Sequence, residues 1–359
     1  MAAYTTIDDP SAYFQTITWT GNGSDPRTIT FDGNSDMQPD WVWEKSRSLA
    51  YQHNIYDSVR GGGKGVVTNT TAAEVSNNAN GYISAFTSDG FTLTAGSTNN
   101  EQLNENTTTY VGWGWKAGTS FTNDASSTGI GSIDSSGSVN QDAGFSIVSY
   151  TGNSPTATTI KHGLNSVPQM IIFKRRVGAG NFTVYHQSLG NTKGMFLTTT
   201  AAADTSAGYF NNTTPTSSVF SVANSGDTNS NGNPTIAYCF AEKQGYSKFG
   251  SYTGNGNADG PFIYTGFKPA WIMTKIISSA DDWQICDNKR DPDNAVFSQL
   301  NANSSAAQND GDAKVDFLSN GFKIRKSGGS WNASGSSFIY MAFAEQPLVT
   351  SSGVPATAR

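Results

Sequence analysis

The sequence predicts an all-β protein made of three tandem β-sandwich repeat units of the jelly-roll or concanavalin-like kind. Its apolar segments are short, rich in aromatic and β-branched residues, and bounded by glycine, asparagine, aspartate and proline, as in strands joined by turns. No segment of helical length keeps an apolar period of 3.6 residues. Several motifs recur three times at fixed spacing within the 359 residues, which is the pattern of a repeated domain.

Each unit is predicted to open with an aromatic residue followed by Thr-Gly-Asn, the three aromatic residues being Trp19, Tyr150 and Tyr252. A proline follows in each unit, at Pro39, Pro168 and Pro269. Two residues later an apolar strand begins, at Trp41, Met170 and Trp271. A lysine occupies the sixth position after each proline, as Lys45, Lys174 and Lys275. Because the spacing is the same in all three, we expect these residues to lie on equivalent strands of units that superpose.

A second apolar strand in each unit ends in a polar residue twelve positions after the lysine, as Asp57, His186 and Asp287. The end of one hairpin strand faces the start of the next, so we expect Lys275 beside Asp282 or Trp283 and not beside Asp287. An arginine stands three residues after each aspartate, as Arg60 and Arg290. We interpret these as turn-stabilising pairs in preference to a catalytic acid with its charge partner.

The domain boundaries follow from these motifs. Residues 1–117 are predicted to form an N-terminal arm plus the first unit, and residues 118–142, rich in Ser, Thr, Gly and Asn, a linker or a surface strap. The second unit is expected over 143–245 and the third over 246–347, followed by a C-terminal tail, 348–359. Each unit should end on an aromatic strand, at 110–117, 236–242 and 338–345.

Composition argues against several classes of function. Only 14% of residues are charged and the net charge is −6, with no basic stripe, so a nucleic-acid partner is not expected. No apolar run reaches 18 residues, so we expect no membrane insertion. The three histidines are too scattered for a zinc site. Residues 32–36 are expected to form a polar turn in place of a calcium loop, and residues 61–65 a flexible hairpin tip in place of a phosphate-binding loop. We therefore predict no cofactor, no metal and no catalytic residues.

Cys239 and Cys286 could in principle form one disulfide. Their positions in the other units carry glycine, alanine or tyrosine, so those copies do without sulfur at either place. We therefore expect two unpaired, structural thiols.

The candidate ligand-binding residues are Trp331 and Asn332. They stand in a loop-like context, residues 327–332, where a large ring has no evident structural task. Exposed aromatic side chains commonly grip sugars or protein partners. The alternative is a loop tryptophan that packs on its own domain. The repeated tryptophans and tyrosines read as core.

Several longer motifs resemble a known group of proteins. They lie at residues 4–11, 36–43, 144–152, 260–262 and 265–272. They resemble an uncharacterised repeat domain of virion structural proteins of tailed bacteriophages, particularly tail-fibre-like proteins of phages that infect marine bacteria and cyanobacteria. The resemblance covers about residues 4–345. It implies lectin-like or jelly-roll sandwiches at the particle surface, and it supplies no catalytic residues to carry over.

The function expected from this resemblance is non-enzymatic: a tail fibre or tail-associated adhesin that contacts a host surface glycan or protein. The alternative is a capsid decoration or vertex protein, and a glycan-degrading enzyme is a distant third. Other virion proteins are expected partners. A homo-oligomer is expected, a trimer by default, with residues 1–13 or 346–359 buried against another chain. The second unit lacks the tryptophan and the Asp-x-x-Arg pair, so the units need not share a binding role.

Overall fold

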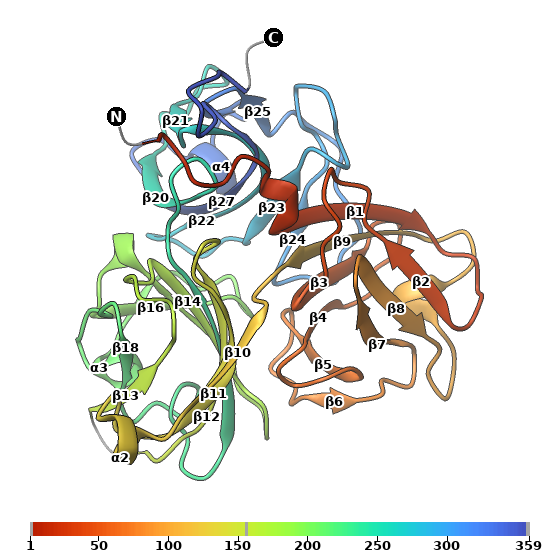
Figure 1. Cartoon of the computed structure of the whole chain (residues 1–359). Helices are drawn as coiled ribbons and strands as arrows, with labels where there is room; N and C mark the ends of the chain where they lie inside the picture. Colours follow the sequence, from red (N-terminus) through yellow and green to blue (C-terminus); the bar gives the residue numbers. More distant parts are fainter. Residues whose placement is uncertain (1–2, 155–156, 357–359) are drawn as a thin grey trace.

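The computed structural model describes residues 3–154 and 157–356, and it confirms the all-β fold class. Strands make up 42% of the chain and helices 6%. The chain forms three lobes (Figure 1), which we call the first lobe (residues 14–115), the second lobe (119–240) and the third lobe (247–347). Each lobe pairs one large antiparallel sheet with one small sheet, as in a β-sandwich.

The three large sheets share one strand order. In the first lobe it is β1 (Phe14–Thr20), β9 (Thr109–Trp115), β3 (Trp41–Ser46), β4 (His53–Asp57), β5 (Lys64–Val67) and β6 (Val75–Ser76). In the second lobe it is β12 (Phe145–Thr151), β19 (Pro234–Phe240), β14 (Met170–Arg175), β15 (Phe182–His186), β16 (Lys193–Phe196) and β17 (Asp204–Thr205). In the third it is β20 (Ser247–Thr253), β27 (Ser337–Pro347), β22 (Phe267–Ile276), β23 (Gln284–Asp287) and β24 (Leu300–Asn301).

The small sheets close each sandwich over an apolar interior. They consist of β2 (Arg27–Thr30), β8 (Gly90–Thr94) and β7 (Tyr82–Thr87), then β13 (Thr158–Lys161) and β18 (Val219–Val222), then β21 (Phe262–Tyr264), β26 (Gly321–Ile324) and β25 (Val315–Leu318). Short helical turns connect the strands: η1 (Pro10–Ala12), α1 (Glu101–Asn104), α2 (Ala125–Thr128), η2 (Gln187–Leu189), α3 (Ala207–Phe210) and α4 (Gly329–Asn332). Trp19, Tyr150 and Tyr252 lie in the three sandwich interiors, which confirms them as core.

The hairpin register confirms the expected separation of the repeated lysines from the residues twelve positions on. Asp57, His186 and Asp287 pair with Trp41, Met170 and Trp271, at the start of the preceding strand. Lys45 pairs with His53 and Lys174 with Phe182, at its other end. Full superposition of the three lobes as copies of one domain stays a prediction.

Residues 118–142 differ from the expected linker. Within them β10 (Thr119–Asn123) and β11 (Ser135–Asn140) form a hairpin that extends the second large sheet by two strands, and β11 pairs with β12 along its whole length. Val139 is 8% exposed and packs in the second sandwich interior. A Ser/Thr/Gly-rich segment can form edge strands because backbone hydrogen bonds hold them and their outer faces meet water.

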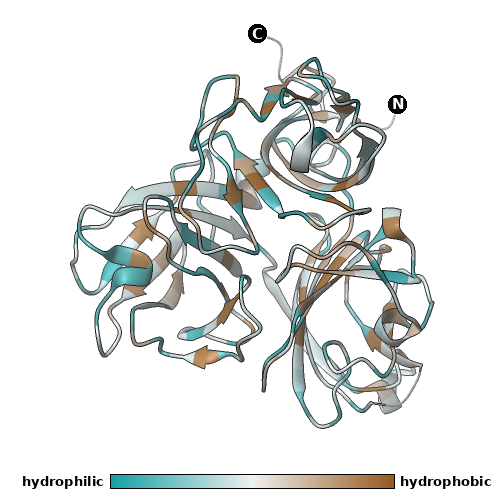
Figure 2. Cartoon of the chain, turned by 180° about the vertical axis from the view of Figure 1, so that it is seen from behind, coloured by the Kyte–Doolittle hydropathy of each residue, from teal (hydrophilic) through white to brown (hydrophobic). Residues whose placement is uncertain are grey.

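A single apolar cluster joins the three lobes, and we call it the central core. The face of each large sheet that points away from its own small sheet contributes to it. Its large members include Trp41, Trp43, Trp113, Trp115, Phe145, Met170, Tyr238, Phe240, Trp271, Trp283, Met341 and Phe343. Figure 2 shows hydrophobic residues on strands of all three lobes and hydrophilic residues in many of the loops. The three sandwiches therefore form one compact body.

Three equivalent backbone hydrogen bonds close the lobes into a ring. Each acceptor carbonyl lies two residues after a repeated lysine. The bonds run from Glu74 N to Arg176 O (2.9 Å), from Ala203 N to Ile277 O (3.0 Å) and from Gln308 N to Arg47 O (2.8 Å). They join the first lobe to the second, the second to the third, and the third back to the first. The contacts are head-to-tail and closed, as in a cyclic trimer built within one chain.

The two ends of the described chain, near residues 3 and 356, lie on the third lobe (Figure 1). The Tyr4 hydroxyl donates to Gly266 O at 2.7 Å, and Ile7 is 2% exposed in the central core. Ser351 N donates to Asp8 Oδ1 at 2.6 Å. The described parts of the arm and tail thus pack on their own chain. We expected residues 1–13 or 346–359 to be buried against another chain. Of these segments, residues 1, 2 and 357–359 lie outside the described residues.

Candidate functional site

The polar residues that end the second hairpin strand of each lobe, Asp57, His186 and Asp287, contact a neighbouring lobe. Asp57 Oδ2 accepts from Arg60 Nε at 2.5 Å, and both side chains are fully buried. The hydroxyl of Tyr238, from the second lobe, donates to the same oxygen at 2.8 Å. The pair therefore stabilises its turn, as predicted, and also holds the neighbouring lobe.

The other two lobes repeat this contact with different chemistry. Asp287 Oδ2 accepts from Arg290 Nε at 2.6 Å and from the indole Nε1 of Trp113, in the first lobe, at 3.0 Å. The equivalent residue of the third lobe is Met341, which pairs with Met273 as Trp113 pairs with Trp43. Its thioether offers no hydrogen-bond donor. The second lobe places His186 there, and its Nε2 lies 3.1 Å from Tyr340 O. A histidine N–H can donate a hydrogen bond to this carbonyl, whereas an aspartate carboxylate at the same position could only accept one.

The three lysines bind backbone carbonyls at the opposite end of the hairpins. Lys174 Nζ donates to Gly180 O at 2.7 Å and Lys275 Nζ to Ile276 O at 2.8 Å. Lys45 Nζ donates to Ser46 O at 2.6 Å. All three residues are 0% exposed, and burial lowers the pKa of each ammonium to about 8. These lysines are buried framework residues.

The assignment of Trp331 and Asn332 as ligand-binding residues is wrong. Trp331 is 0% exposed, and its Nε1 donates to Gln299 Oε1 at 2.8 Å. Asn332 is also 0% exposed, and its Nδ2 donates to Asn255 Oδ1 and Asn257 O. Their loop folds into α4, which turns the indole into the third sandwich. The alternative, a tryptophan packed on its own domain, is correct.

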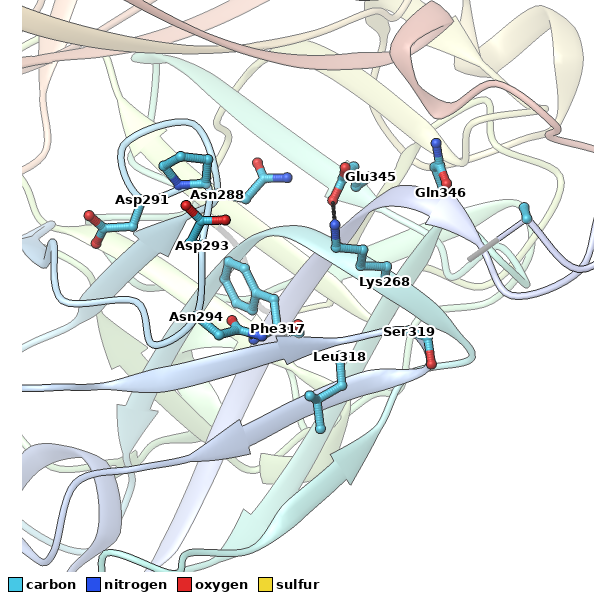
Figure 3. A pocket seen from close by; sticks show the side chains of 12 residues that line it. Lys268, Asn288, Asp291, Asp293, Asn294, Phe317, Leu318, Ser319, Glu345 and Gln346 are labelled. Carbon is cyan, nitrogen blue, oxygen red and sulfur yellow. Dashed lines mark hydrogen bonds and ion pairs between the residues drawn. The ribbon is translucent and has the colours of Figure 1, made fainter. Parts of the chain in front are cut away.

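A surface cavity of about 410 Å³ lies on the third lobe (Figure 3). It sits between the loop from Asn288 to Asn294, the end of β25 and the end of β27. The loop belongs to this lobe alone: Ile285 pairs with Leu300, 15 positions on, whereas Ile55 and Val184 pair with residues 11 positions on. The cavity is therefore a local addition to the shared fold.

The polar groups of this cavity mostly hold the loop in place. Asp291 Oδ2 accepts from Phe297 N at 2.7 Å, and Asn294 bonds both the N–H and the carbonyl of Phe317 at 2.8 Å. Lys268 Nζ lies 2.7 Å from Glu345 Oε2, with the two side chains pointing together (Figure 3). Glycoside hydrolysis needs one carboxyl in an apolar setting facing a second across the sugar. In this lining Asp291 is hydrogen-bonded and Glu345 is ion-paired, while Asp293 is the remaining carboxylate.

Glu44 is a perturbed carboxyl elsewhere in the chain. Its side chain lies inside the first sandwich at 0% exposure, where Oε1 accepts from Asn54 Nδ2 at 2.5 Å. Burial raises the pKa of this carboxyl well above its ordinary value of 4.5. A perturbed carboxyl marks a functional site when it lines a cleft. Glu44 is instead fully buried in the first sandwich, so we expect its effect on stability.

Glu44→Gln is expected to gain stability relative to the wild type as the pH rises. Between pH 4.5 and the raised pKa the folded state holds a proton that the unfolded chain has lost, so wild-type stability falls as pH rises through that window. Within that window the difference in free energy of unfolding between the two proteins should shift toward the variant as the pH rises, by at most about 1.4 kcal/mol per pH unit. Urea unfolding of both proteins from pH 5 to 8 measures the difference. A difference independent of pH would contradict this assignment.

Both cysteines are unpaired and buried, as predicted. Burial raises the pKa of each thiol, to about 12 for Cys286. Within residues 3–154 and 157–356 no group of three His, Cys, Asp or Glu side chains is placed to hold a metal ion. Over the same residues no helix has the length and apolar character to cross a bilayer.

Sequence reasoning missed an exposed aromatic pair on the third lobe. Phe262 and Tyr264, on β21, are 46% and 53% exposed. The signal was present in the repeats: these two residues flank Ile263 where the first unit has Thr28 and Thr30 around Ile29. To find this signal, residues 262–264 must be aligned with residues 28–30 of the first unit. The Thr-Gly-Asn motifs alone do not determine that alignment.

Comparison with known proteins gives one match. A family model described as a domain of unknown function (DUF7483) matches residues 9–347. No curated protein and no solved structure matches the chain. The matched range includes all three lobes, so the family is defined over the whole ring and not over a single sandwich.

Proposed function

The chain belongs to the DUF7483 family, a domain of unknown function, and for this member we propose a non-enzymatic structural role in the virion of a tailed bacteriophage. The protein is a tail fibre or tail-associated adhesin at the particle surface. Its ring of sandwiches is the rigid body, and its outer loops and strands meet the host. The phage assignment rests on the sequence motifs at residues 4–11, 36–43 and 265–272.

The observation that carries the non-enzymatic role is where the repeated ionisable residues lie. Lys45, Lys174, Lys275, Asp57, His186 and Asp287 are all 0% exposed. Each bonds a neighbouring lobe or its own turn. An enzyme keeps its acid, base or nucleophile within reach of a substrate, whereas this chain uses these groups to hold three sandwiches together. Such a tightly packed body is expected of a structural component of a virus particle.

The proposed homo-oligomer, a trimer by default, must use the outer surface of the ring. The inner faces of the three large sheets are already covered within one chain by the central core. Light scattering on the purified protein tests the proposal: a trimer has three times the chain mass of 38.1 kDa. A single species at the chain mass at micromolar concentration would rule the trimer out.

Immunogold electron microscopy of particles of the phage whose genome encodes this chain tests the virion role. Antibody raised against the purified protein should label the tail, and mass spectrometry of washed particles should recover its peptides. Label on the capsid would replace the tail assignment by capsid decoration. Absence from washed particles would overturn the virion role, and release of new reducing ends from host polysaccharide would overturn the non-enzymatic one.

A further inference from the structure

The outer face of β21 carries two aromatic side chains that water reaches. Phe262 is 46% exposed and Tyr264 53%, while Ile263 between them is 7% exposed and faces the sandwich interior. Side chains alternate along a strand, so the two rings stand on the same outer face. Neither ring belongs to the apolar interior of the third sandwich.

The other two lobes show that the fold does not need these rings. Ile29, Ile160 and Ile263 are equivalent, because they pair with Phe91, Phe220 and Phe322. The flanking outer positions are Thr28 and Thr30 in the first lobe, and Thr159 and Lys161 in the second. Two sandwiches thus form with small or charged residues where the third exposes aromatic ones, so the sandwich itself does not require the pair.

Glycine backbones support both rings. A Cβ placed on Gly321 would lie 3.0 Å from Cε2 of Phe262, so the missing side chain leaves room for this ring beside the neighbouring strand. Tyr264 lies beside Gly266, whose carbonyl accepts from the Tyr4 hydroxyl. Both rings also remain about half exposed to water. An exposed aromatic ring is the surface on which the C–H face of a sugar stacks, at little cost in side-chain entropy.

Two ion pairs flank the rings on the same sheet. Lys323, directly opposite Phe262 on β26, pairs with Asp259, and Arg325 Nη1 lies 3.3 Å from Asp316 Oδ2. The first and second lobes have Thr92 and Ser221 at the position of Lys323. The four charges cancel, and they supply donors and acceptors around an apolar centre. This pattern complements an uncharged ligand that is rich in hydroxyl groups.

We propose that Phe262 and Tyr264 form a binding platform for neutral polysaccharide, stacking on pyranose rings while the flanking ion pairs bond their hydroxyls. The size of the platform favours a glycan over a protein. The two rings expose roughly 200 Å² together, whereas a stable protein interface buries about 800 Å² on each partner. The proposal rests on the adhesin role above and gives it a residue-level contact.

Affinity electrophoresis of the full-length protein tests the platform. Native gels cast with laminarin, dextran or agarose present β-glucan, α-glucan and galactan backbones. We expect retardation in at least one of them. The double variant Phe262→Thr/Tyr264→Thr, which installs the residues of the first lobe, should weaken that retardation at least tenfold. Because two lobes fold with such residues, the melting temperature of the variant should match that of the wild type.

Phe297→Thr is the matched control, since Phe297 is 41% exposed on the same lobe but lies outside β21. It should bind as the wild type does. The platform is overturned if no gel retards the wild type, or if the double variant binds as well as the wild type. It is also overturned if the double variant loses only self-association in light scattering, which would make β21 a contact between copies. None of these results bears on particle labelling, which tests the virion role separately.

Discussion

Asp57→Ala is expected to lower the free energy of unfolding by about 3 to 5 kcal/mol, because it leaves the buried Arg60 guanidinium without its counter-charge. Both side chains of the pair are fully buried, and the carboxylate also accepts from the Tyr238 hydroxyl of the second lobe. The loss therefore has a part within the first lobe and a part across the interface. Guanidinium-induced unfolding at pH 7 measures it.

A double-mutant cycle separates the two parts. If the lobes touch as described, Asp57→Ala and Tyr238→Phe should be non-additive by about 0.5 kcal/mol or more. The matched control is Asp36→Ala, because Asp36 is exposed, and its loss should stay within about 0.5 kcal/mol. Strict additivity of the first two variants would mean that Asp57 does not reach the second lobe.

Trp41→Ala is expected to cost about 3 to 5 kcal/mol through the cavity that it leaves in the central core. The indole is 0% exposed, and its ring centre lies 4.8 Å from that of Tyr238 and 5.7 Å from that of Phe240. Both neighbours belong to the second lobe. Denaturant unfolding, followed by the remaining tryptophan fluorescence, gives the loss.

Trp271→Ala provides the equivalent measurement where the ring closes. Its indole lies 5.6 Å, centre to centre, from Trp115 of the first lobe. We expect a similar loss, with Phe297→Ala, exposed on the surface, within about 0.5 kcal/mol of the wild type. A loss below about 1 kcal/mol for either tryptophan would show that its lobe does not pack there.

The features of the fold that depend on residues close together in the sequence were predicted correctly. Alternation and turn residues gave the all-β class, and the antiparallel rule placed Lys45 and Asp57 at opposite ends of one hairpin. The absence of sulfur at the positions equivalent to Cys239 and Cys286 in the other units predicted free thiols.

The sequence did not predict what depends on contacts between distant segments. Trp41, Trp113 and Trp271 were recognised as core, but alternation cannot say whether a second buried face meets a helix, a sheet or another lobe. The same limit hid the partner of Asp57, which lies 181 positions away at Tyr238. Residues 118–142 looked like a linker because edge strands need few apolar side chains.

The candidate site was predicted less well than the fold. Trp331 stood in a glycine-rich segment, where composition alone favours a loop, and tertiary packing folded that segment into α4. Phe262 and Tyr264 sit in an apolar run, where exposed and buried rings look alike until the strand is aligned with its equivalents.

The central claim is that three lobes of one chain close into a ring, and disulfide trapping across the closing contact tests it most directly. Arg47→Cys/Gln308→Cys probes the contact between the first and third lobes. Glu74→Cys/Arg176→Cys probes the equivalent contact between the first and second, where the same backbone hydrogen bond is made. The native cysteines are buried, so they should not compete.

We predict that both pairs form a disulfide within one chain after mild oxidation, seen as a linked peptide in mass spectrometry and a monomer band on a non-reducing gel. An open row of lobes would keep residues 47 and 308 apart. The account would be contradicted if the 74–176 pair linked within the chain while the 47–308 pair stayed reduced or linked only between chains.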